Sequence, residues 1–410
     1  MRYGWAMGSE VVRHVLGCMT GTSLDGLDVA LTRIVGRGRA MRAELLGTVS
    51  RPLPEGLRRV LLAMAGGEAH RPIEFLRAAR HLGVVHAEGC AAALAEHGRG
   101  LAVDFVVAHG QSIWHAPEDR LSWQLFDPWP IVRGLGLAVC FDLRQADLIA
   151  GGQGAPITPI ADPILYPIPR GLVLNLGGIV NYTHWSEAKP PEASGPVIGG
   201  GDVGPCNLLI DPTVRSLFPG QTMDRDGRLS GEAAADRGLV VALVSAVAEA
   251  RGGARSLGRE QFGGSWIGER LGRHGGGLSA SVQLASVIAA VAEIAAQEIR
   301  GAVGAGGGGE VEGHLAGADR AGGFGRVIAA GGGARNPRLV RELGRALGVE
   351  VEMSSRWGWP AEAREAGAFA VLGALSADGV AITLPAVTGA ESPGIAGSWV
   401  VPPGRVVAGR

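Results

Sequence analysis

Four short apolar runs along the chain end in a glycine-rich turn. They cover His14–Met19, Val103–Ala108, Leu172–Leu176 and Arg326–Ala330. A short apolar run bounded by turn residues is typical of a buried strand. Because ligands of open α/β sheets bind beyond the carboxyl ends of the strands, these four ends predict one cleft built from several strands.

Two segments have the apolar periodicity of an amphipathic helix. Ser281–Val303 places Val282, Ile288, Val291, Ala295 and Ile299 close to one face, and Pro337–Leu347 places Leu339, Leu343 and Leu347 on one side. Strands that alternate with helices predict an α/β architecture. Residues 186–196 are rich in Pro, Glu and Ser, and residues 301–325 are dominated by Gly and Ala. We interpret both as surface loops without chemistry.

The size of the chain predicts two domains, because 410 residues exceed one ordinary core and 46% of them are apolar. The formal net charge is -1, with acids and bases interspersed. This argues against a nucleic-acid platform, which needs a basic field for phosphate contacts. Small, near-neutral metabolites and locally bound phosphorylated ones stay open as ligands.

Cysteine usage favours a reducing compartment. The four cysteines form no C-x-x-C pair and lie far apart, at Cys18, Cys90, Cys140 and Cys206. We therefore expect neither a metal knuckle nor a disulfide framework, and a cytoplasmic location. Met1–Arg13 carries charges and lacks the apolar run of a signal peptide. Gln283 and Glu293 interrupt Ala280–Ala296, the segment most similar to a membrane span, so no membrane association is expected.

The segment Gly21–Asp28 follows the first predicted strand and suits phosphate binding. Gly21 permits close approach of an anion to the backbone, and Thr22 and Ser23 offer hydroxyl and amide donors. Asp25 could hold a magnesium ion, which prefers carboxylate and water ligands. A phosphate loop between two strands differs from a Walker loop, which leads into a helix and needs G-K-[ST]. An ordinary β-hairpin turn explains the segment equally well.

Two further glycine turns suit a nucleotide. Asn175–Asn181 predicts a second strand-turn-strand, which paired with the first would clamp a phosphate chain from two sides. The triplet Gly331–Gly333 would let a flat adenine or ribose lie against the backbone. Such triplets are also common simple turns, so the pairing of the two loops is more specific than any one of them.

Other polar residues near glycines are candidates for sugar chemistry. Asp202 lies among glycines and could act as a general base, or could only form an Asx-turn. His109 and His115 could bind a metal, but no carboxylate or cysteine has suitable spacing, so a structural or substrate-contacting turn is favoured. The stretches 142–144 and 151–156 are suited to hydrogen-bonding a sugar.

Taken together and in order, these motifs resemble the anhydro-N-acetylmuramic acid kinase family from about Gly17 to Pro402. The resemblance also rests on Gly258-Arg259-Glu260 with Phe262, Trp357-Gly358, Glu365-Ala366 with Ala368-Phe369-Ala370, and Leu384–Ala390. It implies a two-domain actin-like ATPase (ribonuclease H-like) sugar kinase fold. Residues 1–135 with about 366–410 would form the first domain and residues 136–365 the second. It also implies a homodimer that closes its domains around substrate.

The resemblance implies a reaction of bacterial peptidoglycan recycling. Such an enzyme takes 1,6-anhydro-N-acetylmuramic acid, ATP with Mg²⁺, and water, and gives N-acetylmuramic acid 6-phosphate and ADP. Asp202 aligns with the catalytic aspartate that deprotonates the water. The nucleotide side would comprise Gly21, Thr22, Ser23, Leu24, Asp25, Gly26, Leu27, Asp28, Asn175, Gly177, Gly178, Gly331, Gly332, Gly333 and Asn336, with Asp25 on the metal. The sugar side would comprise His109, Gln111, Arg144, Gln153, Gly204, Asn207 and Glu365.

Departures from the family pattern gather on the sugar side. The family usually has three arginines where Arg144-Gln145-Ala146 stand, Thr where Val203 stands, and Gly where Cys206 stands. It usually has Phe-His at Ala161-Asp162 and Gly-Asp at Phe126-Asp127. Fewer cationic groups would favour an uncharged substrate.

Three alternatives follow from this pattern. The first is a kinase of another anhydro-sugar such as levoglucosan. The second is a catalytically silent actin-like protein that binds nucleotide, against which the intact Asp202 and Asp25 speak. The third is a hexokinase-type enzyme in which Asp202 deprotonates a sugar hydroxyl and no water is added.

Overall fold

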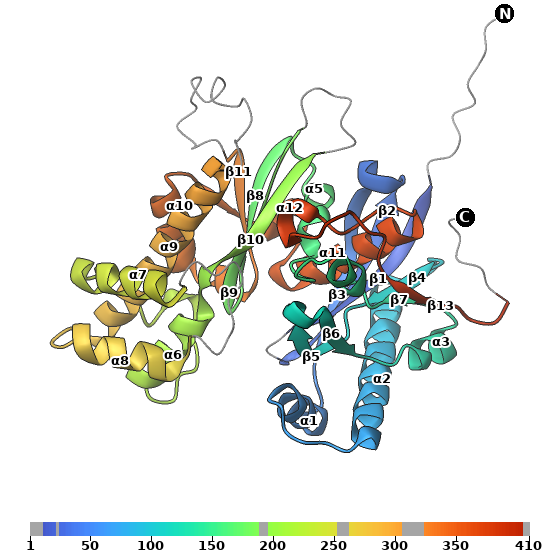
Figure 1. The fold of residues 1–410 in the computed structure, drawn as a ribbon, viewed down its shortest axis with the longest axis horizontal. Coiled ribbons are helices and arrows are strands. Elements are labelled where there is room, and N and C mark those ends of the chain that lie inside the picture. Colours follow the sequence, from blue (N-terminus) through green and yellow to red (C-terminus); the bar gives the residue numbers. More distant parts are fainter. Residues whose placement is uncertain (1–10, 22–23, 188–195, 252–261, 306–323, 405–410) are drawn as a thin grey trace, which may run out of the picture. The chain divides into compact units, whose positions relative to one another are not determined.

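The computed structural model describes residues 11–21, 24–187, 196–251, 262–305 and 324–404. They form two compact units (Figure 1). The first consists of the described residues of 1–167 and 362–410, and the second of those of 168–361. The predicted Thr22, Ser23 and Gly258–Glu260 lie outside the described residues.

The sheet of the first unit has six strands in the order β13-β7-β4-β1-β2-β3. β1 (Val12–Thr20), β2 (Gly26–Val35) and β3 (Arg42–Pro52) pair antiparallel, whereas β4 (Phe105–Ala108) and β7 (Ala138–Phe141) extend the sheet from β1 in parallel. β13 (Ser398–Val400) pairs antiparallel with β7 at the edge. The predicted strands at residues 14–19 and 103–108 are therefore confirmed, the second with a later start.

This sheet corrects the predicted domain boundary at residue 135. β7 pairs with β4 and β13, and residues 136–167 belong to the first unit. The boundary lies between Pro167 and Ile168, and the second one lies at Ala361 rather than residue 365. Local apolar patterning does not reveal which sheet a short strand joins, which is why the prediction missed β7.

Besides this sheet, the first unit contains helices and a separate two-stranded hairpin. The helices are α1 (Glu55–Ala65), α2 (Pro72–His97), α3 (Trp129–Leu135), α4 (Gln145–Ile149), α5 (Asp162–Leu165), α11 (Ala361–Ala377) and α12 (Pro385–Thr388). The hairpin is β5 (Gln111–Ala116) with β6 (Leu121–Leu125). α2 packs along β2 and β3 (Figure 1). On β1, a Cβ at Gly17 would lie 1.9 Å from the Ala366 carbonyl oxygen, so glycine lets α11 pack against the strand.

The second unit repeats the same strand order, β10-β9-β8-β11-β12. β8 (Arg170–Leu176), β9 (Ile179–Ser186) and β10 (Val197–Pro205) are antiparallel, and β11 (Arg326–Ala330) and β12 (Val351–Met353) follow β8 in parallel. The strands predicted at residues 172–176 and 326–330 are confirmed. One ribonuclease H-like strand order in both units is the organisation of the actin-like fold, so the predicted fold class is confirmed.

The core of the second unit is built around the long helix α9 (Ala280–Ala305). It packs against α6 (Asn207–Leu217), α7 (Arg237–Arg251) and α10 (Pro337–Leu347), while α8 (Gly264–His274) lies on α6. By length and composition alone α9 could cross a membrane, but its apolar side chains lie in the core cluster of this unit. The predicted bounds of α10 are confirmed. The loop predicted from residue 301 was wrong at its start, because α9 extends through residue 305, and its centre lies outside the described residues.

Candidate active site

The predicted phosphate turn connects β1 and β2, as expected. Leu24 anchors it: its side chain is buried, it adopts a left-handed φ of 57°, and its backbone N–H donates to the Gly21 carbonyl at 3.1 Å. The Asp25 side chain is 75% exposed, and its Oδ1 lies 3.7 Å from Nη2 of Arg58. The buried side chain of Leu27 packs in the core. Leu24 and Leu27 could thus contact a ligand only through their backbone, whereas the Asp25 carboxylate is accessible.

The other end of this motif is structural. Asp28 lies on β2, where its Oδ1 accepts from Ser50 Oγ at 2.5 Å. A Cβ at Gly26 would lie 2.6 Å from the Arg51 carbonyl oxygen, so glycine there lets β3 approach. These contacts fix the start of β2, whereas the Asp25 carboxylate just before it is accessible.

His109 and Arg144 form the centre of the predicted sugar side in the first unit. His109 Nε2 accepts from Arg144 Nη2 at 2.9 Å and Nε at 3.3 Å, and its Nδ1–H donates to the Gly110 carbonyl at 2.8 Å. Burial, together with the positive charge of Arg144, lowers the pKa of His109 to about 3. His109 is therefore a neutral imidazole that orients a guanidinium, and it belongs to no described cluster that could hold a metal.

A buried carboxylate that the sequence analysis missed holds the Gly151–Pro156 loop. Asp147 Oδ2 accepts from the Gly154 N–H at 2.7 Å, and its Oδ1 accepts from Thr388 Oγ1 at 2.6 Å. A Cβ at Gly152 would lie 2.2 Å from Asp147 Oδ2, so only glycine fits there. The Gln153 N–H donates to the Thr388 carbonyl at 3.0 Å, and Arg144 Nη1 donates to the Gly154 carbonyl at 2.7 Å. These bonds bring His109, Arg144 and Gln153 together.

Glu365 is adjacent in sequence to a buried ion pair. Arg364 Nη2 lies 2.7 Å from both Asp162 oxygens, and both side chains are almost fully buried. Burial disfavours the charged guanidinium, but Asp162 and other neighbours keep the pKa of Arg364 above its ordinary value. The negative charge of Glu365 acts on Arg144 as well as on Arg364. Glu365 thus belongs to the same polar region as His109 and Arg144.

Several departures from the family pattern have structural contacts. Gln145 Nε2 donates to the Ser122 carbonyl at 2.6 Å, and Asp162 forms the ion pair with Arg364. Phe126 packs edge-on against His86 with ring centroids 5.0 Å apart. Gln111 is buried, with its Nε2 3.4 Å from the Ser112 carbonyl. The Gln145 bond to Ser122 of β6 therefore connects α4 to the β5–β6 hairpin.

The predicted second phosphate turn lies between β8 and β9 in the second unit. Its carbonyls face the start of α6: the Gly178 oxygen accepts N–H groups of Cys206 at 2.8 Å and Leu208 at 3.1 Å, and the Gly177 oxygen accepts that of Asn207 at 3.2 Å. Burial raises the pKa of the Cys206 thiol to about 12, so this thiol is neutral. The turn and the first turn of α6 form one rigid corner.

The glycine triplet after β11 packs against this corner. Gly331 has a φ of 80°, and a Cβ there would lie 2.6 Å from Asn175 Oδ1. A Cβ at Gly333 would lie 2.9 Å from the Leu176 carbonyl oxygen and 3.4 Å from Asn207 Oδ1. The structure thus brings Asn175, Gly177, Gly178, Asn207 and Gly331–Gly333 together. At Gly332 a Cβ would meet nothing within 4 Å, which leaves open space beside the backbone.

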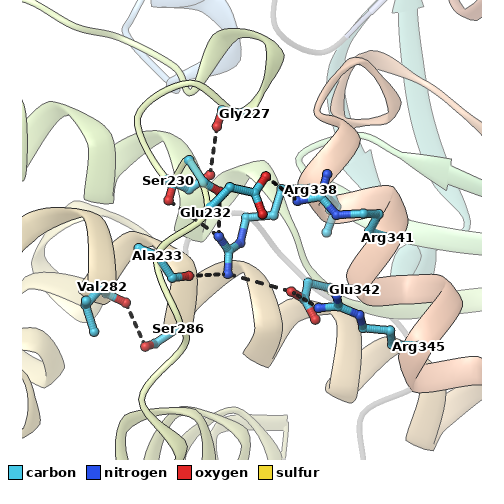
Figure 2. A network of polar contacts seen from close by, with 12 residues as sticks. Gly227, Ser230, Glu232, Ala233, Val282, Ser286, Arg338, Arg341, Glu342 and Arg345 are labelled. Carbon is cyan, nitrogen blue, oxygen red and sulfur yellow. Dashed lines mark hydrogen bonds and ion pairs between the residues drawn. The ribbon is translucent and has the colours of Figure 1, made fainter.

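Asn336 has a clear structural role. Its Oδ1 accepts the N–H groups of Arg338 at 3.0 Å and Leu339 at 3.3 Å, which caps α10, and its Nδ2 donates to Asp224 Oδ2 at 3.1 Å. Figure 2 shows the neighbouring Arg338, whose guanidinium donates to the carbonyls of Gly231 and Ala233, both at 2.7 Å. These contacts tie residues 224–233 to the start of α10, directly after the glycine triplet.

Asp202 lies on β10 at an irregularity of the sheet. It pairs with Asn181 of β9, whereas Gly204 pairs with Val180, so Val203 is an extra residue in the strand. Asp202 is half-buried, and Val203 is fully buried. A Cβ at Gly204 would lie 2.7 Å from Ile294 Cγ2 of α9. β-bulges commonly re-aim a side chain next to active sites, so this local geometry suits a catalytic carboxylate.

The residues suit magnesium and ATP by their chemistry. Mg²⁺ is usually bound through one or two carboxylates, water and phosphates, so the accessible Asp25 carboxylate suffices on the protein side. No group of three or more His, Cys, Asp or Glu in the described part of the chain could form an all-protein metal cage. The open space beside Gly332 allows the backbone approach that a phosphate or ribose needs.

A family model described as anhydro-N-acetylmuramic acid kinase matches residues 13–402. The chain belongs to this family. An anhydro-N-acetylmuramic acid kinase of Synechococcus sp. (strain WH7803) is 35% identical over 405 residues, which cover 95% of this chain and all of that protein. One of Streptomyces coelicolor is 33% identical over 96% of this chain and 94% of its own length. The family predicted from the motifs is confirmed.

Solved structures match most of the length of the chain, with TM-scores below 0.5. Xylulose kinase from Rhodospirillum rubrum covers 88% of the chain and 91% of its own, with 12% identity and a TM-score of 0.41. Component A of the (R)-2-hydroxyglutaryl-CoA dehydratase from Acidaminococcus fermentans covers 88% and 96%, with 12% identity and a TM-score of 0.43.

Proposed function

We propose that this chain is an ATP-dependent kinase that opens 1,6-anhydro-N-acetylmuramic acid with water and phosphorylates O6, in peptidoglycan recycling. The observation that carries the proposal is Asp202, a half-buried carboxylate at a bulge of β10 in a chain of this family. A general base must be held at a defined position, and a bulge between two ordered strands does this.

The proposed reaction consumes one water molecule in each catalytic cycle. Asp202 takes a proton from water, whose oxygen forms a bond to the anomeric carbon as the bond between that carbon and O6 breaks. The released O6 attacks the γ-phosphorus of ATP, and ADP leaves. The products are N-acetylmuramic acid 6-phosphate, ADP and the proton that Asp202 then releases to solvent. Phosphoryl transfer depends on positioning and charge stabilisation, which glycine-rich turns supply through backbone N–H groups.

Each unit offers its own residues to the nucleotide in this proposal. Gly21–Asp25 would contact phosphate oxygens, and the β8–β9 turn with Gly331–Gly333 would contact phosphate and nucleoside. Asp25 would hold Mg²⁺, which neutralises phosphate charge when bound. Asn336 would act through its cap of α10, which fixes the end of the glycine triplet.

On the sugar side, the contacts of Arg144 bear on the substrate. Three of its N–H groups are already used by His109 Nε2 and the Gly154 carbonyl, and Gln145 and Ala146 bring no charge. This favours one second candidate, a kinase of an uncharged anhydro-sugar such as levoglucosan. We retain the anhydro-muramic sugar as first choice because the family model spans residues 13–402.

We further propose a homodimer in the cytoplasm. The four cysteines are free and buried, which agrees with a reducing compartment, and the dimer rests on the family resemblance alone.

The test is ADP release with magnesium-ATP and each of 1,6-anhydro-N-acetylmuramic acid, levoglucosan, N-acetylmuramic acid and glucose. We expect turnover with the first sugar, and in heavy-oxygen water one labelled oxygen at the anomeric carbon at short times. Turnover with levoglucosan alone would support the second candidate, a kinase of an uncharged anhydro-sugar. Turnover of glucose without label would support the hexokinase-type reaction, and no turnover despite ATP binding would contradict an enzyme.

A further inference from the structure

Arg251, at the end of α7, contacts the strand of the proposed base. Its Nη1 donates to the Val203 carbonyl at 2.6 Å and lies 2.8 Å from Glu298 Oε2 of α9. The Arg251 side chain is only 12% exposed. A guanidinium thus spans from a carboxylate on one helix to the carbonyl of the residue directly after Asp202.

Val203 directly follows Asp202 and has no pairing partner of its own in β9. It is the extra residue of the β10 bulge, and so the β9 ladder does not fix its register. Its side chain is buried in the core of the second unit, and the next residue, Gly204, packs against Ile294. The Arg251 bond adds a polar restraint on the Val203 carbonyl. Helices of this unit thus hold the Val203 side chain, the Val203 carbonyl and the following Gly204.

We propose that Arg251 is a positioning residue that fixes the Asp202 carboxylate through the carbonyl of Val203, with Glu298 orienting its guanidinium. The inference rests on the proposed function only for its kinetic consequence. A base that is displaced by about 1 Å can lose about 100-fold in rate, so a restraint one residue away acts on catalysis. No nucleotide contact in the proposal involves Arg251, and the β8–β9 turn has its own bonds to Cys206, Asn207 and Leu208, so nucleotide binding should change little.

The same two helices carry a matched control. Arg237 at the start of α7 pairs with Glu293 of α9, and the Arg237 side chain is 72% exposed. This pair has the chemistry and the helices of Arg251 and Glu298 but has no described contact with β10. Arg237→Met therefore removes an arginine of the same helix pair, at a more exposed position, without touching the bulge.

The test compares Arg251→Met, Arg251→Lys and Arg237→Met by kinetics and by hydrogen exchange of a peptide that spans residues 197–207. For Arg251→Met we expect kcat to fall about 10- to 100-fold, with KM for ATP within about twofold, and faster exchange confined to this peptide. Arg251→Lys should recover part of both effects, and Arg237→Met should match the unaltered protein.

Two results would overturn the proposal. One is that Arg251→Met shows the same kcat and the same hydrogen exchange as Arg237→Met. The other is faster exchange throughout the second unit, which would mean a general loss of stability. If the unaltered protein turns over none of the sugars, the proposed function fails, and the exchange comparison alone still decides whether Arg251 holds the bulge.

Discussion

The two units share one strand order but differ in what lies at the ends of equivalent strands. In the first unit the turn after the first strand carries Asp25, whose carboxylate is 75% exposed. In the second unit the equivalent turn, Gly177–Gly178, has no acid, and its carbonyls accept N–H groups from the start of α6. One turn presents an accessible charge, and the other is a rigid backbone corner.

At the third strand of each sheet, the candidate carboxylate lies in the second unit and not in the first. β3 ends at Arg51 and Pro52, whereas β10 carries Asp202 beside a bulge. The strand order therefore decides where loops and strand ends lie, but single residues decide their chemistry. In our account the first unit supplies a carboxylate for a metal and the second supplies a carboxylate for a proton.

The interiors of the units differ as well. The first unit buries charged or polar groups close to its predicted site, namely Asp147, His109 and the Asp162–Arg364 pair. The second buries Asp224 and Arg338 around the Asn336 cap of α10, beside an apolar core around α9. The two units should therefore respond differently to loss of a charge, to pH and to loss of a cap.

The largest of these effects is expected for Asp162→Asn. It leaves the Arg364 guanidinium buried without its counter-charge, which should destabilise the first unit by about 3–5 kcal/mol. Hydrogen exchange of β4 should report this loss, whereas exchange of β11 in the second unit should be unchanged. The double variant Asp162→Leu, Arg364→Met should regain much of the stability. A loss below about 1 kcal/mol would show that the ion pair does not hold the first unit.

Acid should destabilise the first unit through His109. The folded pKa is about 3 and the ordinary value is 6.5, so the unfolded chain binds more protons between these values. Stability from this group is complete above pH 6.5 and is lost as pH falls toward about 3. Near pH 5 the slope should be about 1.4 kcal/mol per pH unit.

The measurement is the opening free energy of β4 by hydrogen exchange between pH 4.5 and 6. In His109→Gln the slope should fall by about that amount, and in the exposed His81→Gln it should not change. Equal slopes in all three proteins would mean that His109 is protonated in the folded state. The buried His86, whose pKa burial lowers to about 4, should add a similar slope of its own.

The smallest effect is expected for Asn336→Ala in the second unit. Loss of the α10 cap should cost about 1–2 kcal/mol, because two N–H groups lose their acceptor and Asp224 loses a donor. Exchange in α10 should quicken while exchange of β4 stays the same. Asn336→Ser keeps an acceptor oxygen at the cap position but has no Nδ2 donor and adds no charge beside Asp224, so it separates the cap from the Asp224 contact.

Local sequence patterns predicted much of the fold. The apolar runs that end in glycine predicted four strands, and the spacing of Leu339, Leu343 and Leu347 predicted α10 with its bounds. The glycine turns that the proposed site uses were predicted for the same reason, because such turns have a local sequence signature. Thr22 and Ser23 remain predictions outside the described residues.

Contacts between distant residues could not be predicted in this way. Arg364 and Asp162 are 202 residues apart, and Arg251 and Val203 are 48 apart. The local sequence around each of these residues does not identify its partner, because a contact between distant residues depends on which elements the fold brings together. The assignment of β7 to the first sheet failed for the same reason.

The most direct test of the account is ADP release by Asp202→Asn with 1,6-anhydro-N-acetylmuramic acid, beside ATP binding by the same variant. We predict that ATP binding is unchanged and that kcat falls by at least about 100-fold, because the variant cannot accept the proton of water. Turnover at the unaltered rate would contradict Asp202 as the base, and with it the proposed division of chemistry between the two units.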